Sequence, residues 1–108
     1  MAAVYLGAAN IGFLGGNSRV KTVAELAAFL APYAKFEQAV KVVDTARAYV
    51  PAGGEGSSEA LLGAHGLEGF AIDSKVKSFA PKTHTASEIL KSGKDILEAV
   101  KRNKVRLR

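Results

Sequence analysis

Short apolar runs alternate with amphipathic, capped segments along this chain, and this alternation constrains the fold more than any other feature. Runs typical of strands begin at Val4, Val40, Phe70 and Lys104. Segments typical of helices lie between them, after Thr22, over 58–65 and after Thr85. Regular alternation of strand and helix favours a parallel sheet with right-handed crossovers. We therefore expect an α/β domain with about four parallel strands and three helices.

The ends of these segments carry local signals. Thr22 with Glu25, and Thr85 with Glu88, have the spacing of a helix capping box. Pro32 should end or kink the helix that follows Thr22, because proline lacks the backbone donor that a helix interior needs. The second strand is expected over 40–45, the third over 70–76 and the fourth over 104–107. Loops are expected over 49–57 and 78–84.

Composition limits the classes of protein that remain. The chain has 108 residues, of which 48% are hydrophobic and 23% charged, an ordinary composition for one small folded domain spanning 1–108. It has no cysteine, which excludes disulfides, thiol catalysis and thiolate metal sites, and with two histidines no metal site is expected. No apolar run reaches the ~18 residues of a membrane span, and the first residues do not resemble a signal peptide. A cytoplasmic location is the resulting expectation, with no membrane partner.

Positive charge is concentrated in the last third of the chain. The formal net charge is +5, and residues 75–108 hold ten Lys and Arg against three Asp and Glu. Such a segment suits a phosphate or nucleic-acid surface, and it equally suits a solvated helix end, where cations complement the helix dipole. No aromatic residue lies among the final charges, as stacking on bases would require. Nucleic acid is therefore not the expected partner.

Chemically capable side chains follow two of the expected strands. Asp44 and Tyr49 follow the run at Val42 and Val43, and Lys75 follows the run at Phe70. The carboxyl ends of parallel strands meet at one edge of a sheet, where βα enzymes collect their proton-transfer groups. Each residue alone also fits a structural role, as a strand-end cap, a loop-packing ring and a surface lysine.

Four short motifs in order resemble the aldo-keto reductase superfamily, and within it the aflatoxin-aldehyde-reductase-like branch. The similarity runs from about Tyr5 to Leu107. The motifs are Asp44, Thr45, Ala46 and Tyr49; then Gly53, Gly54 and Glu55; then Ser58, Glu59, Leu62 and Gly63; then Ser74, Lys75 and Val76.

The resemblance implies a fold and a reaction. The family folds as a (β/α)8 barrel and reduces aldehydes and ketones with NADPH, so this chain resembles the N-terminal half of such a TIM barrel. Tyr49 matches the tyrosine that donates a proton to the carbonyl oxygen. Lys75 matches the lysine that assists it, and Asp44 matches the carboxylate that pairs with this lysine. Gly7 and Ala8, in the loop after the first strand, would contact NADP through the backbone.

The chain also departs from the family pattern. The family's catalytic histidine belongs near the end of the fourth strand, and neither His65 nor His84 matches that position; both are expected at the surface. Ser74 replaces a common threonine, and Arg106 stands where an acidic residue is usual. Most cofactor contacts in the family come from the second half of the barrel. Two hypotheses therefore stay open: a truncated NADP-dependent carbonyl oxidoreductase, and a non-catalytic half-barrel that pairs with a copy of itself or with a complementary half.

Overall fold

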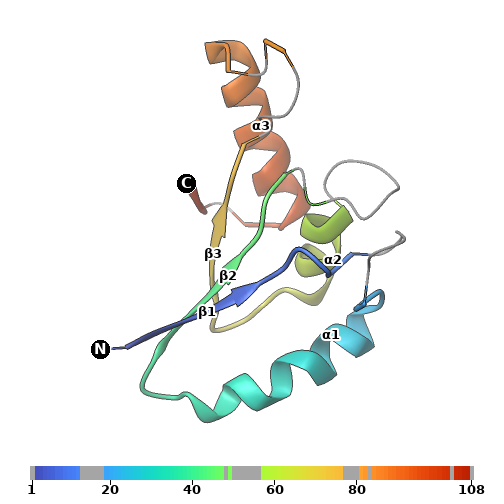
Figure 1. Cartoon of the computed structure of the whole chain (residues 1–108), viewed down its shortest axis with the longest axis vertical. Helices are drawn as coiled ribbons and strands as arrows, with labels where there is room; N and C mark the ends of the chain where they lie inside the picture. Colours follow the sequence, from blue (N-terminus) through green and yellow to red (C-terminus); the bar gives the residue numbers. More distant parts are fainter. Residues whose placement is uncertain are drawn as a thin grey trace.

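The computed structural model describes residues 2–12, 19–47, 49, 57–76, 81–82, 84–102 and 104–107. Strands and helices alternate along this part of the chain, as Figure 1 shows. In chain order the elements are β1 (Ala3–Gly7), α1 (Val23–Leu30), the 3-10 helix η1 (Ala31–Lys35), β2 (Val40–Asp44), α2 (Ser57–His65), β3 (Ala71–Ser74), α3 (Ala86–Ala99) and β4 (Arg106–Leu107). Most of the loop expected over 49–57, with its Gly53, Gly54 and Glu55, and part of the loop expected over 78–84 lie outside the described residues.

The four strands form one parallel sheet in the order β1-β2-β3-β4. Leu6 pairs with Val43, and Val43 pairs with Ile72. This arrangement confirms the predicted α/β class, with four parallel strands and three α-helices among the described residues. The strand order follows the chain without a reversal, so right-handed crossovers place successive helices on the same side of the sheet.

The strands are shorter than the sequence predicted. The strand expected over 70–76 is Ala71–Ser74, and the strand expected over 104–107 is Arg106–Leu107. Backbone pairing between the second and third strands nevertheless continues past their ends. The amide of Thr45 donates to the carbonyl of Asp73 (2.9 Å), and the amide of Arg47 donates to that of Lys75 (3.0 Å). These bonds keep the segments after β2 and β3 close together.

Both predicted caps form at the helix N-termini. Thr22 Oγ1 accepts the amide of Glu25 at 3.0 Å, and Thr85 Oγ1 accepts the amide of Glu88 at 3.3 Å. The Glu25 carboxylate accepts the amide of Lys21 (2.8 Å), whereas in a capping box it would accept the amide of the cap residue, Thr22. Helix α1 ends at Leu30, and the chain continues into the 3-10 helix η1, whose first turn contains Pro32. The end of the α-helix at this proline is the one expected.

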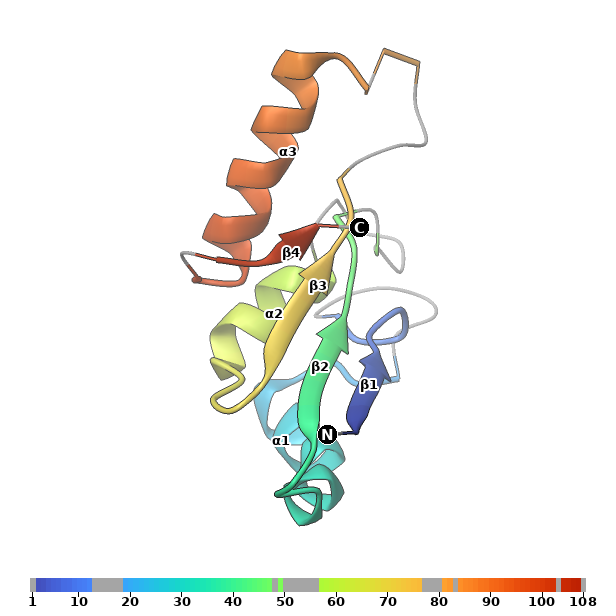
Figure 2. The same ribbon diagram turned by 90° about the vertical axis from the view of Figure 1, so that its left-hand side faces the viewer.

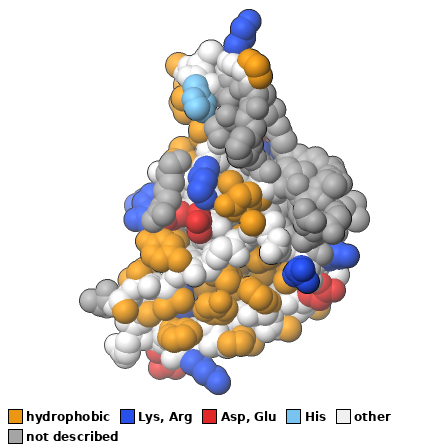
Figure 3. All heavy atoms as spheres, in the orientation of Figure 1, with side chains coloured by type: hydrophobic (Ala, Val, Ile, Leu, Met, Phe, Trp, Pro, Cys, Tyr) orange, Lys and Arg blue, Asp and Glu red, His pale blue; other side chains and the backbone are white. Residues whose placement is uncertain are grey.

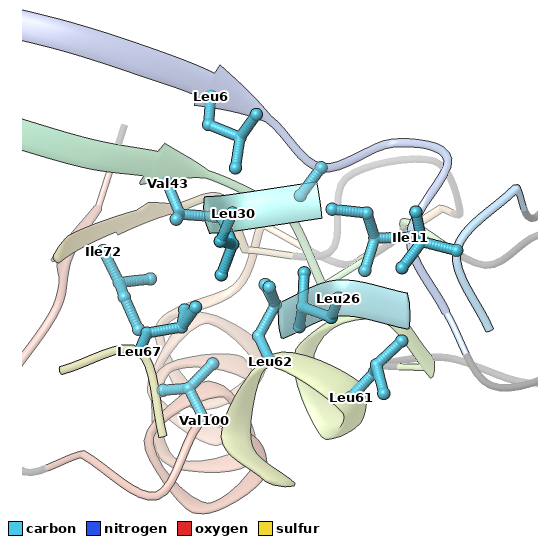
Figure 4. Packing of buried hydrophobic residues seen from close by; sticks show 12 residues of the cluster. Leu6, Ile11, Leu26, Leu30, Val43, Leu61, Leu62, Leu67, Ile72 and Val100 are labelled. Atoms are coloured by element: carbon cyan, nitrogen blue, oxygen red, sulfur yellow. The ribbon is translucent and has the colours of Figure 1, made fainter. Parts of the chain in front are cut away.

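The hydrophobic core lies on one face of the sheet. Leu6, Val43 and Ile72, one from each of the first three strands, point from the sheet towards the helices (Figure 4). Leu26 and Leu30 of α1 and Leu61 and Leu62 of α2 meet them, joined by Leu67 and Val100. Helices α1 and α2, together with Val100 at the end of α3, therefore cover this face.

The opposite face of the sheet, here called the open face, carries the exposed residues Ala3, Tyr5, Val40, Ala71 and Arg106, together with Val42 and Asp73, which are buried. Tyr5 is 47% exposed and Val40 46%. In Figure 2 the sheet faces the viewer with α1 and α2 behind it, and no described helix lies over its front. Hydrophobic side chains gather in the lower half of Figure 3, over the region of β1, β2 and α1. Parallel sheets are usually covered on both faces, so this open face is the unusual feature of the fold.

None of the helices described here is long and apolar enough to cross a membrane.

Candidate active site at the ends of strands β2 and β3

The candidate site is built on an ion pair between two strand ends. Asp44 is the last residue of β2, and Lys75 directly follows β3. Lys75 Nζ lies 2.6 Å from Asp44 Oδ1 and 2.9 Å from the carbonyl oxygen of Thr45. Because the strands are parallel and in register, the backbone brings the carboxylate and the ammonium to the same edge of the sheet. Both side chains are about one-third exposed, at 30% and 37%.

Tyr49 lies against the same lysine. Lys75 Nζ is 5.3 Å from the centroid of the Tyr49 ring, a cation–π distance. The tyrosine backbone is fixed on both sides: its amide donates to the carbonyl of Ala46 (3.1 Å), and its carbonyl accepts the amide of Ser58 (3.4 Å). The structure thus brings Asp44, Tyr49 and Lys75 together around one ammonium group.

The surroundings of Lys75 keep it charged. Burial lowers the pKa of Lys75, but the hydrogen bond to Asp44 and the neighbouring Tyr49 phenol together raise the pKa by more. The net direction is upward from the ordinary value of 10.5, so Lys75 is an ammonium at neutral pH. An ammonium beside a phenol oxygen stabilises negative charge that develops there when the phenol gives up a proton.

The two residues predicted to contact a cofactor occupy different environments. Gly7 is exposed at the end of β1, and a Cβ placed there would meet no atom within 4 Å. Ala8 is fully buried, and its amide donates to the carbonyl of Asp44 at 3.0 Å. Its carbonyl oxygen accepts the amide of Ile11 and the hydroxyl of Ser58. Gly7 therefore offers free surface to a ligand, whereas the backbone of Ala8 is occupied in holding β1 to β2.

A buried polar cluster lies beside the ion pair, and the sequence did not predict its connections. Glu59, in the first turn of α2, accepts a hydrogen bond from Arg47 Nη1 at 2.8 Å and another from Ser74 Oγ at 2.9 Å. The Glu59 side chain is 0% exposed and that of Arg47 15%. Glu59 and Ser74 were singled out in the sequence only as members of the family motifs, where Ser74 replaces a common threonine. The one signal in the sequence is that Glu59 directly precedes the apolar residues Ala60, Leu61 and Leu62, since a charge buried beside them needs partners.

A second charged pair lies on the open face. Arg106 Nε donates to Asp73 Oδ1 at 2.9 Å, and Arg106 Nη2 donates to the hydroxyl of Tyr5 at 3.0 Å. Arg106 pairs in register with Asp73, and Asp73 with Asp44. The departure noted at position 106 thus places an arginine across from a buried aspartate, which balances the aspartate's charge.

The histidines take no part in the contacts of Lys75 that are described above. His84 is exposed, as expected. His65 is half-buried rather than at the surface, because its Nδ1 accepts the amide of Leu67 (3.1 Å) at the end of α2. Within the described residues, no group of three or more His, Asp or Glu side chains is arranged to hold a metal ion.

Comparisons with known proteins add no relative. A scan against protein-family models, a search of curated proteins and a search of solved structures each found no match.

Proposed function

We propose that this chain provides the catalytic half of an NADPH-dependent carbonyl reductase of the aldo-keto reductase type. One observation carries the proposal: the ammonium of Lys75 is bound to Asp44 at 2.6 Å while it lies over the ring of Tyr49. The substrate class is a small aldehyde or ketone.

The proposed reaction divides its work among these three residues. NADPH, when bound, would supply the hydride for the carbonyl carbon and would be oxidised to NADP⁺. Tyr49 gives its phenol proton to the carbonyl oxygen, which completes the alcohol. Lys75 stabilises the negative charge left on the phenol oxygen, and Asp44 holds the ammonium in place. Gly7, exposed at the end of the neighbouring strand, is the residue that we assign to contact with NADPH.

The proposed architecture is one half of a (β/α)8 barrel. In such a barrel the strands follow one another in chain order and the helices form an outer ring. The order β1-β2-β3-β4, with α1 and α2 against one face, supports this assignment over a doubly wound sheet, whose strand order reverses. We infer that the open face belongs to the barrel interior and is completed by further polypeptide or by a second copy.

Turnover and cofactor binding test the proposal together. NADPH fluorescence is followed as the purified chain is titrated, and oxidation of NADPH by an aromatic aldehyde is then measured. We expect NADPH to bind saturably. We expect turnover to fall at least ~100-fold in Tyr49→Phe, because loss of a general acid lowers the rate by this factor or more. Tyr33→Phe is the matched control, since Tyr33 packs between Phe29 and Phe36. Absence of NADPH binding, or undiminished turnover in Tyr49→Phe, would contradict the proposal.

A second candidate function is that of a half-barrel interaction module. The observation that favours it is the open face, where a groove of about 470 Å³ is lined by residues that include Tyr5, Val40, Asp73 and Arg106. Exposed apolar surface of this kind marks association sites. The proposed partner is a second copy of the chain or a complementary half-barrel.

Sedimentation velocity over a range of protein concentrations tests this association. We expect a dimer in the native chain and a monomer in Val40→Lys, because a charge would be buried in the interface. Leu90→Lys, at an exposed position of α3, is the control and should leave the dimer intact. A native chain that stays monomeric and binds no apolar dye would argue against the module.

A further inference from the structure

Glu59 is the most deeply buried charged side chain near the candidate site. It lies in the first turn of α2 with no exposed surface. Its position near a helix N-terminus favours a negative charge, but a carboxylate removed from water still needs partners to offset the loss of hydration. Its two carboxylate oxygens divide between two donors: Oε1 accepts from Arg47 and Oε2 from Ser74.

Both donors are attached to the backbone of Lys75. Ser74 is the residue directly before Lys75. Arg47 donates its backbone amide to the carbonyl oxygen of Lys75 at 3.0 Å. Through Oε2, Glu59 therefore binds Ser74, the residue before Lys75. Through Oε1 it binds Arg47, whose amide is bound to the Lys75 carbonyl.

Through Arg47, the same carboxylate also contacts the segment between the other two candidate residues, Asp44 and Tyr49. Arg47 lies between Asp44 and Tyr49 in the chain, and its guanidinium makes a further contact with the carbonyl oxygen of Asp95 in α3 (3.4 Å). Through Arg47 and Ser74, Glu59 thus links the segment after β2 to the end of β3. The backbone hydrogen bond from the Thr45 amide to the Asp73 carbonyl joins the same two segments.

The electrostatics make a purely stabilising role a poor explanation of Glu59. Burial raises the pKa of Glu59 above its ordinary value, and the hydrogen bonds from Ser74 and Arg47 lower it by less. The ionised carboxylate is thus held at a net cost, and apolar residues of similar volume often replace buried ion pairs without loss of stability.

We propose that Glu59 is a positioning residue that, through Ser74 and Arg47, holds the backbone of Lys75 so that its ammonium stays against Asp44 and Tyr49. The inference rests on the proposed function for the roles of Lys75 and Tyr49. The geometry that it assigns to Glu59 can be measured without any turnover.

The test measures the reactivity of Lys75 in the free chain. The chain is labelled at mildly alkaline pH with a limiting amount of acetic anhydride, and the extent of labelling at each lysine is read by peptide mass spectrometry. Only the free amine reacts, so the rate at Lys75 rises about tenfold for each unit by which its pKa falls. We expect Glu59→Ala to raise labelling of Lys75 by about this factor relative to exposed Lys94, because the ammonium leaves Asp44.

Two further variants separate positioning from general loosening. Glu59→Gln keeps an acceptor for Arg47 and a polar partner for Ser74, so labelling should stay close to that of the native chain. Ser74→Ala removes one link alone and should give an intermediate increase; it serves if Glu59→Ala fails to fold, as judged by circular dichroism. Unchanged labelling of Lys75 in folded Glu59→Ala, or in Ser74→Ala where Glu59→Ala does not fold, would overturn the proposal. The assay contains neither NADPH nor aldehyde, so failure of carbonyl reduction leaves its result intact.

Discussion

Substitution of Gly63 by alanine is expected to lower the free energy of unfolding by about 3 kcal/mol or more. Gly63 lies in α2 where this helix meets the end of α3. A Cβ at this position would lie 2.0 Å from the carbonyl oxygen of Ala99 and 3.0 Å from the Cα atom of Val100. Both are backbone atoms, so the clash cannot be relieved by a change of rotamer. The two helices would have to move apart.

Gly93→Ala is the matched control for this prediction. Gly93 is also a helical glycine, in the middle of α3, but a Cβ there would meet no atom within 4 Å. The substitution should therefore raise stability by about 1 kcal/mol, the difference in helix propensity between alanine and glycine. Urea unfolding followed by circular dichroism measures both changes. Equal stability of Gly63→Ala and the native chain would show that α2 and α3 are not packed as described.

The contact at Gly63 also bears on the candidate site. Glu59 lies one turn before Gly63 in α2, and Arg47 reaches from Glu59 to the carbonyl oxygen of Asp95 in α3. Close packing of α2 on α3 therefore sets the position of the carboxylate that binds Ser74 and Arg47. Stability at the helix contact and geometry around Lys75 are two consequences of the same packing.

The fold was predictable because its signals are local. The apolar runs before Asp44 and Asp73 predicted the central strands, and the threonines at 22 and 85 predicted where two helices begin. Parallel pairing then followed from the alternation of strands and helices. The exact lengths were not predictable, because they depend on which residues of neighbouring strands pair: the two residues of β4 pair with Asp73 and Ser74 of β3.

The candidate site was predictable only in part. Because parallel strands end together, Asp44 and Lys75 were expected at one edge, and the structure places them in contact. The connections of Glu59 depend on which side of α2 faces the sheet, which the weak apolar pattern of this short helix did not indicate. The burial of Ala8 had a similar origin: its backbone is bound to Asp44 and Ser58, which are distant from Ala8 in the sequence. Long-range partners of this kind leave no periodic signal.

The second large effect is expected for Arg47→Met, which removes the positive charge from Glu59. At neutral pH the substitution should lower the free energy of unfolding by about 3 kcal/mol, because it leaves a buried carboxylate without its cation. Lys91→Met is the control. Lys91 pairs with Asp95 at 2.8 Å but is 69% exposed, and loss of such a surface pair should cost about 0.5 kcal/mol or less.

The cost of Arg47→Met should depend on pH in a direction that identifies Glu59 as its source. The pKa of Glu59 is raised in the folded chain above its unfolded value of 4.5, and loss of Arg47 raises it further. A raised pKa means that the folded state holds the proton more tightly, so its contribution to stability is complete below pH 4.5 and is lost as the pH rises through the folded pKa. The destabilisation by Arg47→Met should therefore be small in acid and grow towards neutral pH.

In the double variant Arg47→Met/Glu59→Gln, which has no buried charge to compensate, the pH dependence should disappear and most of the stability should return. A pH-independent loss in Arg47→Met would instead assign the effect to packing of the arginine side chain, and would remove Glu59 from its place at the centre of the cluster.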